Sequence, residues 1–396
     1  MSQVTAILVV HDGATWLPQV VAALANQSRT PNRTIAVDTG SKDGSGKLLS
    51  GARIKSISIN RGEGFGSAVT EAVATLPPVE SEDEWIWLLH DDSAPDSKAL
   101  ENLLAAVTDR PNIAMVGPKI LGWNDRSHLL EVGISIARNG ARWTGLEKDE
   151  YDQGQHDGIF EVLSVSTAGA LIKRSVFEEL GGFDEKLDLF RDDVDFGWRV
   201  HAAGQSVLVN TDAVIYHAEA AASERREVDV DEAFLHRPHL LDRRNAAYVL
   251  LTNSTWWMLP FISLQVTGAA LARAIGYLFA KLPGYASDEL LALLRLFTRP
   301  DLVRAGRKWR KEDRLVSPRV VTRFMPSRIS QFRSAIDALT DSIQAKLFSA
   351  QTEFKSEISD DEDLLIPDTS RNWKALLKRP EFIAFFSALI FSIIFS

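Results

Sequence analysis

The sequence contains no cysteine, which removes several classes of chemistry from this chain. Without thiols it can form no disulfide, zinc–thiolate site or cysteine nucleophile, so any bound metal must be held by oxygen or imidazole groups. Basic residues are not in excess either. The formal net charge is −9 at pH 7, which argues against a general nucleic-acid-binding protein. Residues 1–10 lack the basic start of a secretory signal, so we expect the N-terminal part to stay in the cytosol.

What the chain does contain is the composition of a folded protein. Of its 396 residues, 45% are hydrophobic and 24% are charged, enough for a sizeable core and more than one structural unit. In the first ninety residues, β-branched runs alternate with helical apolar spacing. We expect strands at residues 4–10, 34–37, 53–59 and 85–89. We expect one helix at residues 16–26, a second that begins at about residue 45, and a third that follows the 60–66 loop and ends at residue 74. This alternation predicts an α/β fold with a mostly parallel sheet flanked by helices.

Residues 85–92 (WIWLLHDD) are the stretch around which the other motifs can be placed. Five large apolar or aromatic residues predict a strand that is buried on both faces, and the run ends in Asp91 and Asp92. Ligands of open α/β sheets bind at the carboxyl ends of the strands, so we expect both acids at a binding site. The alternative is that they only cap the turn that Ser93 and Pro95 would form.

A second acid cluster and a histidine follow later in the chain. Asp192 and Asp193 begin a predicted helix, where the helix dipole alone could explain them. His217 ends a short predicted strand. Carboxylates and imidazoles suit Mg²⁺ or Mn²⁺, which commonly neutralise a departing diphosphate. A carboxylate off the metal could take the proton from an attacking hydroxyl. Together these groups predict transfer from a nucleoside diphosphate to an alcohol.

Two features near the first strands allow two interpretations each. Gly62, Gly64 and Gly66 lie where a strand gives way to a helix, so they could let a diphosphate approach backbone N–H groups, or they could form a tight turn only. Their spacing and position do not fit the dinucleotide-binding fingerprint. Asp38, at the end of the second strand, could accept a hydrogen bond from a base or ribose, or it could cap the following turn.

Beyond residue 92 the pattern is less regular. A helix is expected from residue 175, and short strands are expected at 115–117, 162–172, 206–209 and 214–217. Small residues at 167–170 would leave room for a substrate. Residues 120–160 are polar, with interspersed glycine and tryptophan, and no periodicity assigns them a structure.

Over residues 1 to about 250 the sequence resembles the inverting glycosyltransferases of family 2, which have the GT-A fold. Within that family it is most similar to bacterial rhamnosyl- and galactofuranosyltransferases. Seven stretches occur in the expected order: 37–45 (VDTGSKDGS), 60–66 (NRGEGFG), 88–92 (LLHDD), 167–174 (TAGALIKR), 181–184 (GGFD), 192–199 (DDVDFGWR) and 216–217 (YH).

The resemblance implies roles for individual residues. It implies that Asp193 is the general base and that Asp192 is its neighbour on the acceptor side. It implies that Asp92 is a direct ligand of Mg²⁺ or Mn²⁺ and that His217 completes the metal site. His90 stands where the family has the first acid of its Asp-x-Asp motif, so this chain departs from the family at one expected metal contact.

The same resemblance implies the substrates and the residues that contact them. The donor would be a UDP- or dTDP-sugar, and the acceptor a glycan or glycolipid of a bacterial envelope. The expected nucleotide contacts are His11, Asp38, Asn60, Gly62, Gly64 and Asp91; the expected acceptor-side residues are Gly169, Asp195, Trp198 and Arg199. In inverting transfer the acceptor hydroxyl attacks the anomeric carbon in one displacement, so no covalent sugar–enzyme intermediate is required.

The last third of the chain differs in composition. Residues 256–280 carry one formal charge, Arg273, and begin with a tryptophan pair, which is the length and pattern of a membrane-associated helix. A basic run at 295–333 follows, and positive charge marks the cytosolic side. We expect a re-entrant or interfacial hairpin, with 288–297 as its second arm, on the cytoplasmic face of the cell membrane. The alternative is a helix that docks on the enzyme itself.

The chain is therefore expected to divide into four parts. These are a catalytic domain at 1–250, a helical membrane-associated basic region at 251–345, an acidic linker at 346–380 and, at 381–396, the start of a transmembrane helix that continues beyond this chain. The basic run could bind anionic membrane lipids or a lipid-diphosphate acceptor, or could simply be solvated.

Two other functions are weighed against the transferase. A nucleotidyl- or phosphosugar-transferase would need a basic loop after the first strand, and residues 11–13 (HDG) are not one. A catalytically silent membrane scaffold with the same fold would not need the acids at 92 and 193, and both are present.

Overall fold

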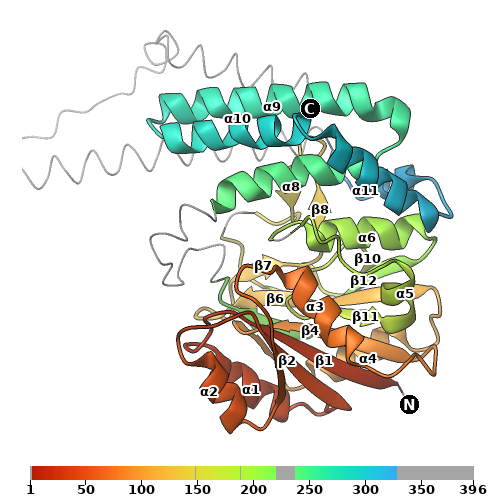
Figure 1. Ribbon diagram of the computed structural model, residues 1–396. Helices are drawn as coiled ribbons and strands as arrows, with labels where there is room; N and C mark the ends of the chain where they lie inside the picture. Colours follow the sequence, from red (N-terminus) through yellow and green to blue (C-terminus); the bar gives the residue numbers. More distant parts are fainter. Residues whose placement is uncertain (1, 148, 188, 220–236, 328–396) are drawn as a thin grey trace, which may run out of the picture.

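The structure is a computed structural model of the 396-residue chain, and it describes residues 2–147, 149–187, 189–219 and 237–327 (Figure 1). The expected linker at 346–380 and the apolar run at 381–396 lie outside these residues.

A parallel four-stranded unit forms one half of the main sheet. Its strands lie in the order β3-β2-β1-β4, and their bounds are β1 (Gln3–Val10), β2 (Arg33–Asp38), β3 (Lys55–Ser58) and β4 (Glu84–His90). All three neighbouring pairs are parallel. The connecting helices are α1 (Leu17–Ala25), α2 (Ser45–Gly51) and α3 (Phe65–Ala74). The expected fold class, a mostly parallel α/β sheet flanked by helices, is confirmed.

Strand β4 is buried on both faces, as its run of apolar residues predicts. Trp87 and Leu89 pack into one hydrophobic cluster with residues of α1 and α4 (Ala99–Val107). Ile86 and Leu88 point to the opposite face and pack into a second cluster that includes residues of α3. The strand is therefore held between two cores, and its carboxyl end is fixed in position.

The other half of the sheet contains longer and less regular strands. The order continues from β4 through β11 (Leu171–Lys173), β6 (Ile113–Gly122) and β12 (Ser206–His217) to β10 (Ile159–Glu161). Strand β11 is antiparallel to both β4 and β6, whereas β12 is parallel to β6. Two further short strands pair along this half, β5 (Ser93–Pro95) with β12 and β7 (Leu129–Glu131) with β6.

Two strand predictions in this half were wrong in detail. The expected strands at 206–209 and 214–217 are one strand, β12, because β6 pairs on both sides of an irregularity between Asn210 and Val214. The expected strand at 162–172 reaches regular pairing only at β11. The chain first turns at Gly169, whose φ is +118° and where a Cβ would clash with Ile215.

Residues 120–160 form short strands rather than one loop. They hold β7, β8 (Ser135–Ile136), β9 (Arg142–Trp143) and the first residues of β10; β8 and β9 make a separate two-stranded hairpin. Helices α5 (Arg174–Glu179) and α6 (Asp192–Ala202) lie on the same side of the main sheet as the β8–β9 hairpin (Figure 1).

A layer of helices covers α6 at the end of the molecule opposite α1 and α2 (Figure 1). Its elements are α8 (Pro238–Asn253), η1 (Trp256–Met258), α9 (Leu259–Phe279), α10 (Pro283–Phe297), α11 (Pro300–Glu312) and η2 (Pro318–Arg323). A third hydrophobic cluster joins this layer to the rest, since it contains Ile136, Val194, Leu250, Val266 and Leu293. The boundary expected at residue 250 falls inside α8, and the described parts on its two sides share this core.

Candidate active site

The carboxyl ends of β1, β2 and β4 meet at one edge of the sheet, where their loops are tied to one another. The His11 Nδ1 lies 2.6 Å from Thr39 Oγ1. Arg61 holds Asp12 Oδ2 at 2.7 Å and donates to the carbonyl of Gly40 at 3.1 Å. Burial would raise the pKa of Asp12, but hydrogen bonds from Arg61 and the Lys42 N–H outweigh it and hold that pKa below its ordinary value. Arg61 was not singled out in the sequence, yet it connects three loops.

Most expected nucleotide-contacting residues lie along this edge. Asp38 ends β2, and its Oδ1 accepts a hydrogen bond from the N–H of Ser41 at 2.8 Å, so it caps the turn after the strand. Asn60 and Gly62 are exposed in the loop before α3, and Gly64 is the N-cap residue of that helix. The loop before α3 is thus exposed at Asn60 and Gly62, whereas Gly64 and Phe65 at the start of the helix are half-buried.

Asp91 has a more internal position than expected for a nucleotide contact. Its side chain is almost fully buried, and Oδ2 accepts a hydrogen bond from the His11 N–H at 2.7 Å. A Cβ at Gly13 would clash with the same carboxylate. Asp91 therefore holds the loop after β1 in place.

A cluster of metal-ligating groups lies beside Asp91. His90, Asp92 and His217 each offer one atom, and these atoms lie within 4.8 Å of one another. The chain brings them together because β5, directly after Asp92, pairs with the end of β12, which places His217 opposite Ser93. His217 Nε2 lies 3.2 Å from Asp92 Oδ1. Burial opposes protonation of His217, but the carboxylate of Asp92 outweighs it and raises its pKa.

His90 is the member of this cluster that the sequence did not assign to the metal. Its Nε2 lies 3.0 Å from Thr167 Oγ1, and the Phe65 ring packs on it at 4.8 Å between centroids. These contacts fix the orientation of the imidazole, as outer contacts of metal-ligating histidines do. Two imidazoles and one carboxylate could hold Mn²⁺; Mg²⁺ favours sites built from oxygen alone. The signals for His90 in the sequence were its place at a strand end beside two acids and its position in the motif, where the family has the first acid of Asp-x-Asp.

The second acid cluster lies in the first turn of α6, as expected. Asp193 Oδ2 is 2.7 Å from Arg142 Nη1, and the other terminal nitrogen of Arg142 lies 2.8 Å from Glu131 Oε1. The carbonyl of Asp193 accepts from the Ser164 hydroxyl at 2.6 Å. Burial and the adjacent charge of Asp193 raise the pKa of Asp192 to about 7. The first turn of α6 thus carries two carboxylates in different environments.

Glu131 connects the two acid clusters electrostatically. Burial raises the pKa of Glu131, and the negative charge of Asp193 raises it further. The positive charge of Arg142 acts in the opposite direction but does not outweigh burial. The negative charge of Glu131 is also among those that raise the pKa of His217. Glu131 and Arg142 come from β7 and β9, in the stretch that the sequence left without structure.

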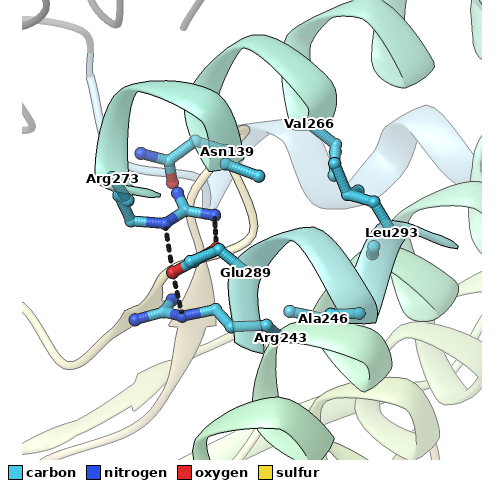
Figure 2. Close-up of a pocket in the computed structure, with 10 residues that line it drawn as sticks. Asn139, Arg243, Ala246, Val266, Arg273, Glu289 and Leu293 are labelled. Carbon is cyan, nitrogen blue, oxygen red and sulfur yellow. Dashed lines mark hydrogen bonds and ion pairs between the residues drawn. The ribbon is translucent and has the colours of Figure 1, made fainter. Parts of the chain in front are cut away.

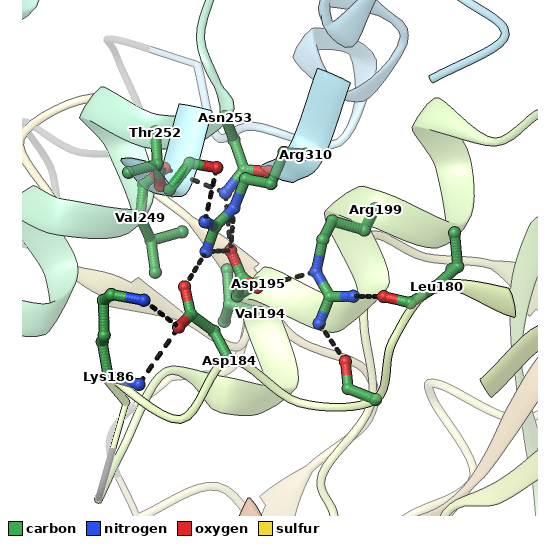
Figure 3. A network of polar contacts seen from close by, with 12 residues as sticks. Leu180, Asp184, Lys186, Val194, Asp195, Arg199, Val249, Thr252, Asn253 and Arg310 are labelled. Carbon is green, nitrogen blue, oxygen red and sulfur yellow. Dashed lines mark hydrogen bonds and ion pairs between the residues drawn. The ribbon is translucent and has the colours of Figure 1, made fainter. Parts of the chain in front are cut away.

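Three of the expected acceptor-side residues lie in a buried network instead of at an open surface. Asp195 Oδ2 accepts from Arg199 Nε at 2.9 Å, and Arg199 donates to the carbonyls of Leu180 and Gly182 (Figure 3). Trp198 is 2% exposed and donates from Nε1 to the carbonyl of Pro318 at 3.2 Å. Each of the three is occupied with contacts that hold α6 in place. The fourth, Gly169, contributes the turn before β11 described above.

Comparison with known proteins identifies the family of this chain. Residues 4–229, more than half of the chain, match the family model described as Glycosyltransferase like family 2. An N-acetylglucosaminyl-diphospho-decaprenol L-rhamnosyltransferase of Mycobacterium tuberculosis is 22% identical over 276 residues, which cover 64% of this chain and 86% of that protein. The galactofuranosyltransferase GlfT1 of the same species is 26% identical over 220 residues, which cover 54% of this chain and 69% of GlfT1.

Among solved structures, GalNAc-T7 with UDP, GalNAc and Mn²⁺ superposes with a TM-score of 0.49 and 13% identity, over 73% of this chain and 54% of that one. The family match rests on the sequence, and it covers every strand-end acid and histidine described above. This chain therefore belongs to glycosyltransferase family 2 and is a glycosyltransferase.

Proposed function

We propose that this enzyme transfers a sugar from a nucleoside-diphosphate sugar to a hydroxyl of a lipid-linked cell-envelope glycan, with inversion at the anomeric carbon. The observation that carries the proposal is the placement of the His90, Asp92 and His217 cluster at the same sheet edge as the nucleotide-side loops, with Glu131 linking it to Asp193. A metal site and a carboxylate off the metal are the two parts that such a displacement needs.

The donor nucleotide would lie along the edge formed by the loops after β1, β2 and β3. Asp38 and Asn60 would contact the base or ribose, and the N-terminus of α3, with Gly64 as its N-cap residue, would face the diphosphate. Asp92, His217 and His90 would hold a divalent cation, which supplies charge neutralisation for the departing diphosphate when it is bound. The Asp91 carboxylate would keep His11 and its loop in the position that receives the nucleotide.

Asp193 would take the proton from the acceptor hydroxyl. Arg142 and the Ser164 hydroxyl hold this residue at two points, so its carboxylate has a fixed direction. Asp192 is the second candidate for the same role, because a pKa of about 7 lies near the pH at which a general base works best. The variants Asp192→Asn and Asp193→Asn distinguish the two candidate bases. The general base is the residue whose replacement removes the acidic limb of the pH profile of kcat/KM.

The relatives suggest the substrate classes. One acts, by its name, on a diphospho-decaprenol-linked saccharide and transfers rhamnose, and another transfers galactofuranose. A polyprenyl-diphosphate-linked saccharide as acceptor and a UDP- or dTDP-sugar as donor are therefore proposed for this chain. Such an acceptor is embedded in a bilayer, so the enzyme would work at the cytoplasmic face of the cell membrane.

Calorimetric titration of UDP and dTDP, each with and without Mn²⁺, tests the proposal. We expect one nucleotide to bind tightly only with the metal, and Asp92→Ala to weaken that binding at least tenfold. Glu71→Ala, on the exposed side of α3, is the control and should bind as the native chain does. If neither nucleotide binds in a metal-dependent way, the proposal fails and the catalytically silent scaffold becomes the better interpretation.

A further inference from the structure

The pair of helices α9 and α10 exposes an unusual amount of apolar surface. Of the nineteen large hydrophobic side chains that are exposed in the described residues, thirteen lie between residues 256 and 297. They are Trp256, Trp257, Phe261, Leu264, Leu271, Ile275, Leu278, Phe279, Leu282, Tyr285, Leu290, Leu294 and Phe297. We call this set the outer stripe. Phe261, Leu264, Leu271, Ile275 and Leu278 of α9 are three, four or seven residues apart, and Leu290, Leu294 and Phe297 of α10 are three or four apart, so each set lies on one side of its helix. Tyr285, at the start of α10, instead packs on Tyr277 and His239. The two helices lie side by side (Figure 1).

The opposite side of the two helices is fixed to the protein. Ile262, Val266 and Ala270 of α9 belong to the hydrophobic cluster shared with α8 and α10. The single charge of α9, Arg273, also turns inward. Its guanidinium lies 2.8 Å from Glu289 of α10, which Arg243 of α8 approaches at 3.1 Å (Figure 2). Burial alone would raise the pKa of Glu289, but hydrogen bonds from His239 and Arg273 hold it below its ordinary value.

The charges that do reach the surface of this pair have one sign. Within residues 256–297, all of which the structure describes, the two acids are Asp288 and Glu289, and both are buried in ion pairs with arginines. The exposed charged residues are Lys281, in the turn between the helices, and Arg295 near the end of α10. Arg299, the next cation, is paired with exposed Asp301 at 2.9 Å and adds no net charge. An apolar stripe bordered by Lys281 and Arg295 fits an anionic lipid surface, whereas two copies of it would repel each other at these positions.

We propose that α9 and α10 lie flat in one leaflet of an anionic membrane, with the outer stripe inserted between head groups and acyl chains. Helix α9 is long enough to cross a bilayer, since 21 residues rise about 31 Å. A crossing helix would, however, carry with it the face that packs on α8 and α10, including the Arg273–Glu289 pair. In the flat orientation that face stays in the protein. Exposed Trp256 and Trp257, just before α9, then lie at the interface, where such rings are favoured.

This orientation has a consequence that rests on the proposed function. Helix α8 packs on α10 and also supports the turn that precedes α6, because Asn245 Nδ2 donates to the carbonyls of Leu189 and Phe190 at 2.6 and 3.2 Å. The membrane-bound pair would therefore hold the helix that carries Asp192 and Asp193 at a fixed height above the bilayer. An acceptor anchored by a polyprenyl chain would reach the site without leaving the membrane.

The test measures the depth of single positions, because other parts of the chain could also bring it to a membrane. The absence of native cysteine allows single labelling of the full chain. Leu264→Cys, Leu271→Cys, Leu278→Cys and Leu294→Cys would each carry an environment-sensitive fluorophore, with vesicles of phosphatidylcholine and phosphatidylglycerol in a 7:3 ratio. We expect a blue shift at all four positions and the same shallow depth by lipid-attached quenchers. Labels at Leu48→Cys and Leu315→Cys, exposed hydrophobic positions elsewhere, should stay in water.

Three other outcomes would overturn the proposal. A crossing helix would place Leu271 deep and Leu264 and Leu278 on opposite sides of the bilayer centre. A contact between two copies would give a blue shift without vesicles that grows with protein concentration. Vesicle binding with all four labels still in water would assign the membrane contact to another part of the chain. Metal-dependent nucleotide binding needs no vesicles, so its failure would be seen separately from the failure of this proposal.

Discussion

Arg310 on α11 and Asp195 on α6 form an ion pair that is almost completely buried, with 2.6 Å between Nη2 and Oδ1 (Figure 3). The same guanidinium lies 2.8 Å from Asp184 Oδ2, which also accepts from the Tyr248 hydroxyl. Asn253 of α8 donates to Asp195 as well. Residues beyond the expected catalytic domain thus complete the charge balance of the helix that carries the two candidate catalytic acids.

Replacing Arg310 should therefore destabilise the whole enzyme. Arg310→Met would leave Asp184 and Asp195 buried with too few partners, and breaking a buried pair in this way costs about 3–5 kcal/mol. We expect the free energy of unfolding in urea to fall by about that amount. Arg304→Met, at an exposed position of the same helix, is the control and should change it by less than about 0.5 kcal/mol. Equal stability of the two variants would mean that the network does not hold α6.

Arg142 should act on catalysis by positioning Asp193. In Arg142→Met the candidate base loses the ion pair at 2.7 Å, so we expect kcat to fall by about 10–100-fold with little change in the KM for the donor. Arg142→Lys should recover part of the loss because it keeps a charge near Asp193 and Glu131. Arg138→Met, in the same hairpin region, is the matched control. A rise in the donor KM with unchanged kcat would place Arg142 in donor binding instead.

The sequence predicts the first half of the sheet well because its information there is local. Strands β1 and β4 contain long apolar runs, β2 has a shorter one, and β3 (Lys55–Ser58) has a single apolar residue. Each strand is followed by a loop with polar residues, and this alternation predicts the order of the elements along the chain. The strand-end position of Asp92 follows from the same local pattern. That Asp92 and His217 share one metal site was implied by the family resemblance, and the structure brings the two side chains to 3.2 Å.

The rest depends on contacts between distant residues. Glu131 and Arg142 belong to strands of three and two residues, which are too short to show a periodic pattern. Arg310 lies 115 positions from Asp195, and in the sequence it is one of several cations in a basic run. Arg273 interrupts an apolar segment, and only the packing of α9 on α10 reveals that it faces Glu289. No local pattern distinguishes these four residues from ordinary surface charges.

The raised pKa of Asp192 should make the stability of the native chain fall as the pH rises. A carboxyl that ionises near pH 7 in the folded state and near its ordinary 3.8 when unfolded binds more protons when folded between these values. Its contribution is present below about pH 4 and is lost by about pH 7. Asp192→Asn removes it, so the difference in unfolding free energy between variant and native chain should grow over this range. With about 1.4 kcal/mol per pKa unit, it would reach the order of 4 kcal/mol.

Chemical denaturation of both proteins at pH 4.5, 5.5, 6.5 and 7.5 measures this difference. Asp149→Asn, an exposed acid, serves as the control and should follow the native chain at every pH. A constant difference between Asp192→Asn and the native chain would show that Asp192 ionises at its ordinary pKa in the folded protein.

His90 should contribute directly to metal affinity. Because its imidazole lies with Asp92 and His217 inside a 4.8 Å cluster, His90→Ala should weaken Mn²⁺ binding by about 10–100-fold while the fold is kept. His90→Asp restores the acid that the Asp-x-Asp motif has at this position. It replaces a nitrogen ligand by oxygen and should move the preference from Mn²⁺ toward Mg²⁺.

Electron paramagnetic resonance of Mn²⁺, with Mg²⁺ as competitor, reads both changes without the need for an active enzyme. His156→Ala, whose ring instead lies 2.8 Å from Glu150, controls for the loss of an imidazole elsewhere. If His90→Ala bound Mn²⁺ as tightly as the native chain does, the site would consist of Asp92 and His217 with ligands from the substrate, and the histidine would serve only to orient Thr167 and Phe65. The two results lead to different designs for an enzyme that works with Mg²⁺, because only in the first does residue 90 determine the metal.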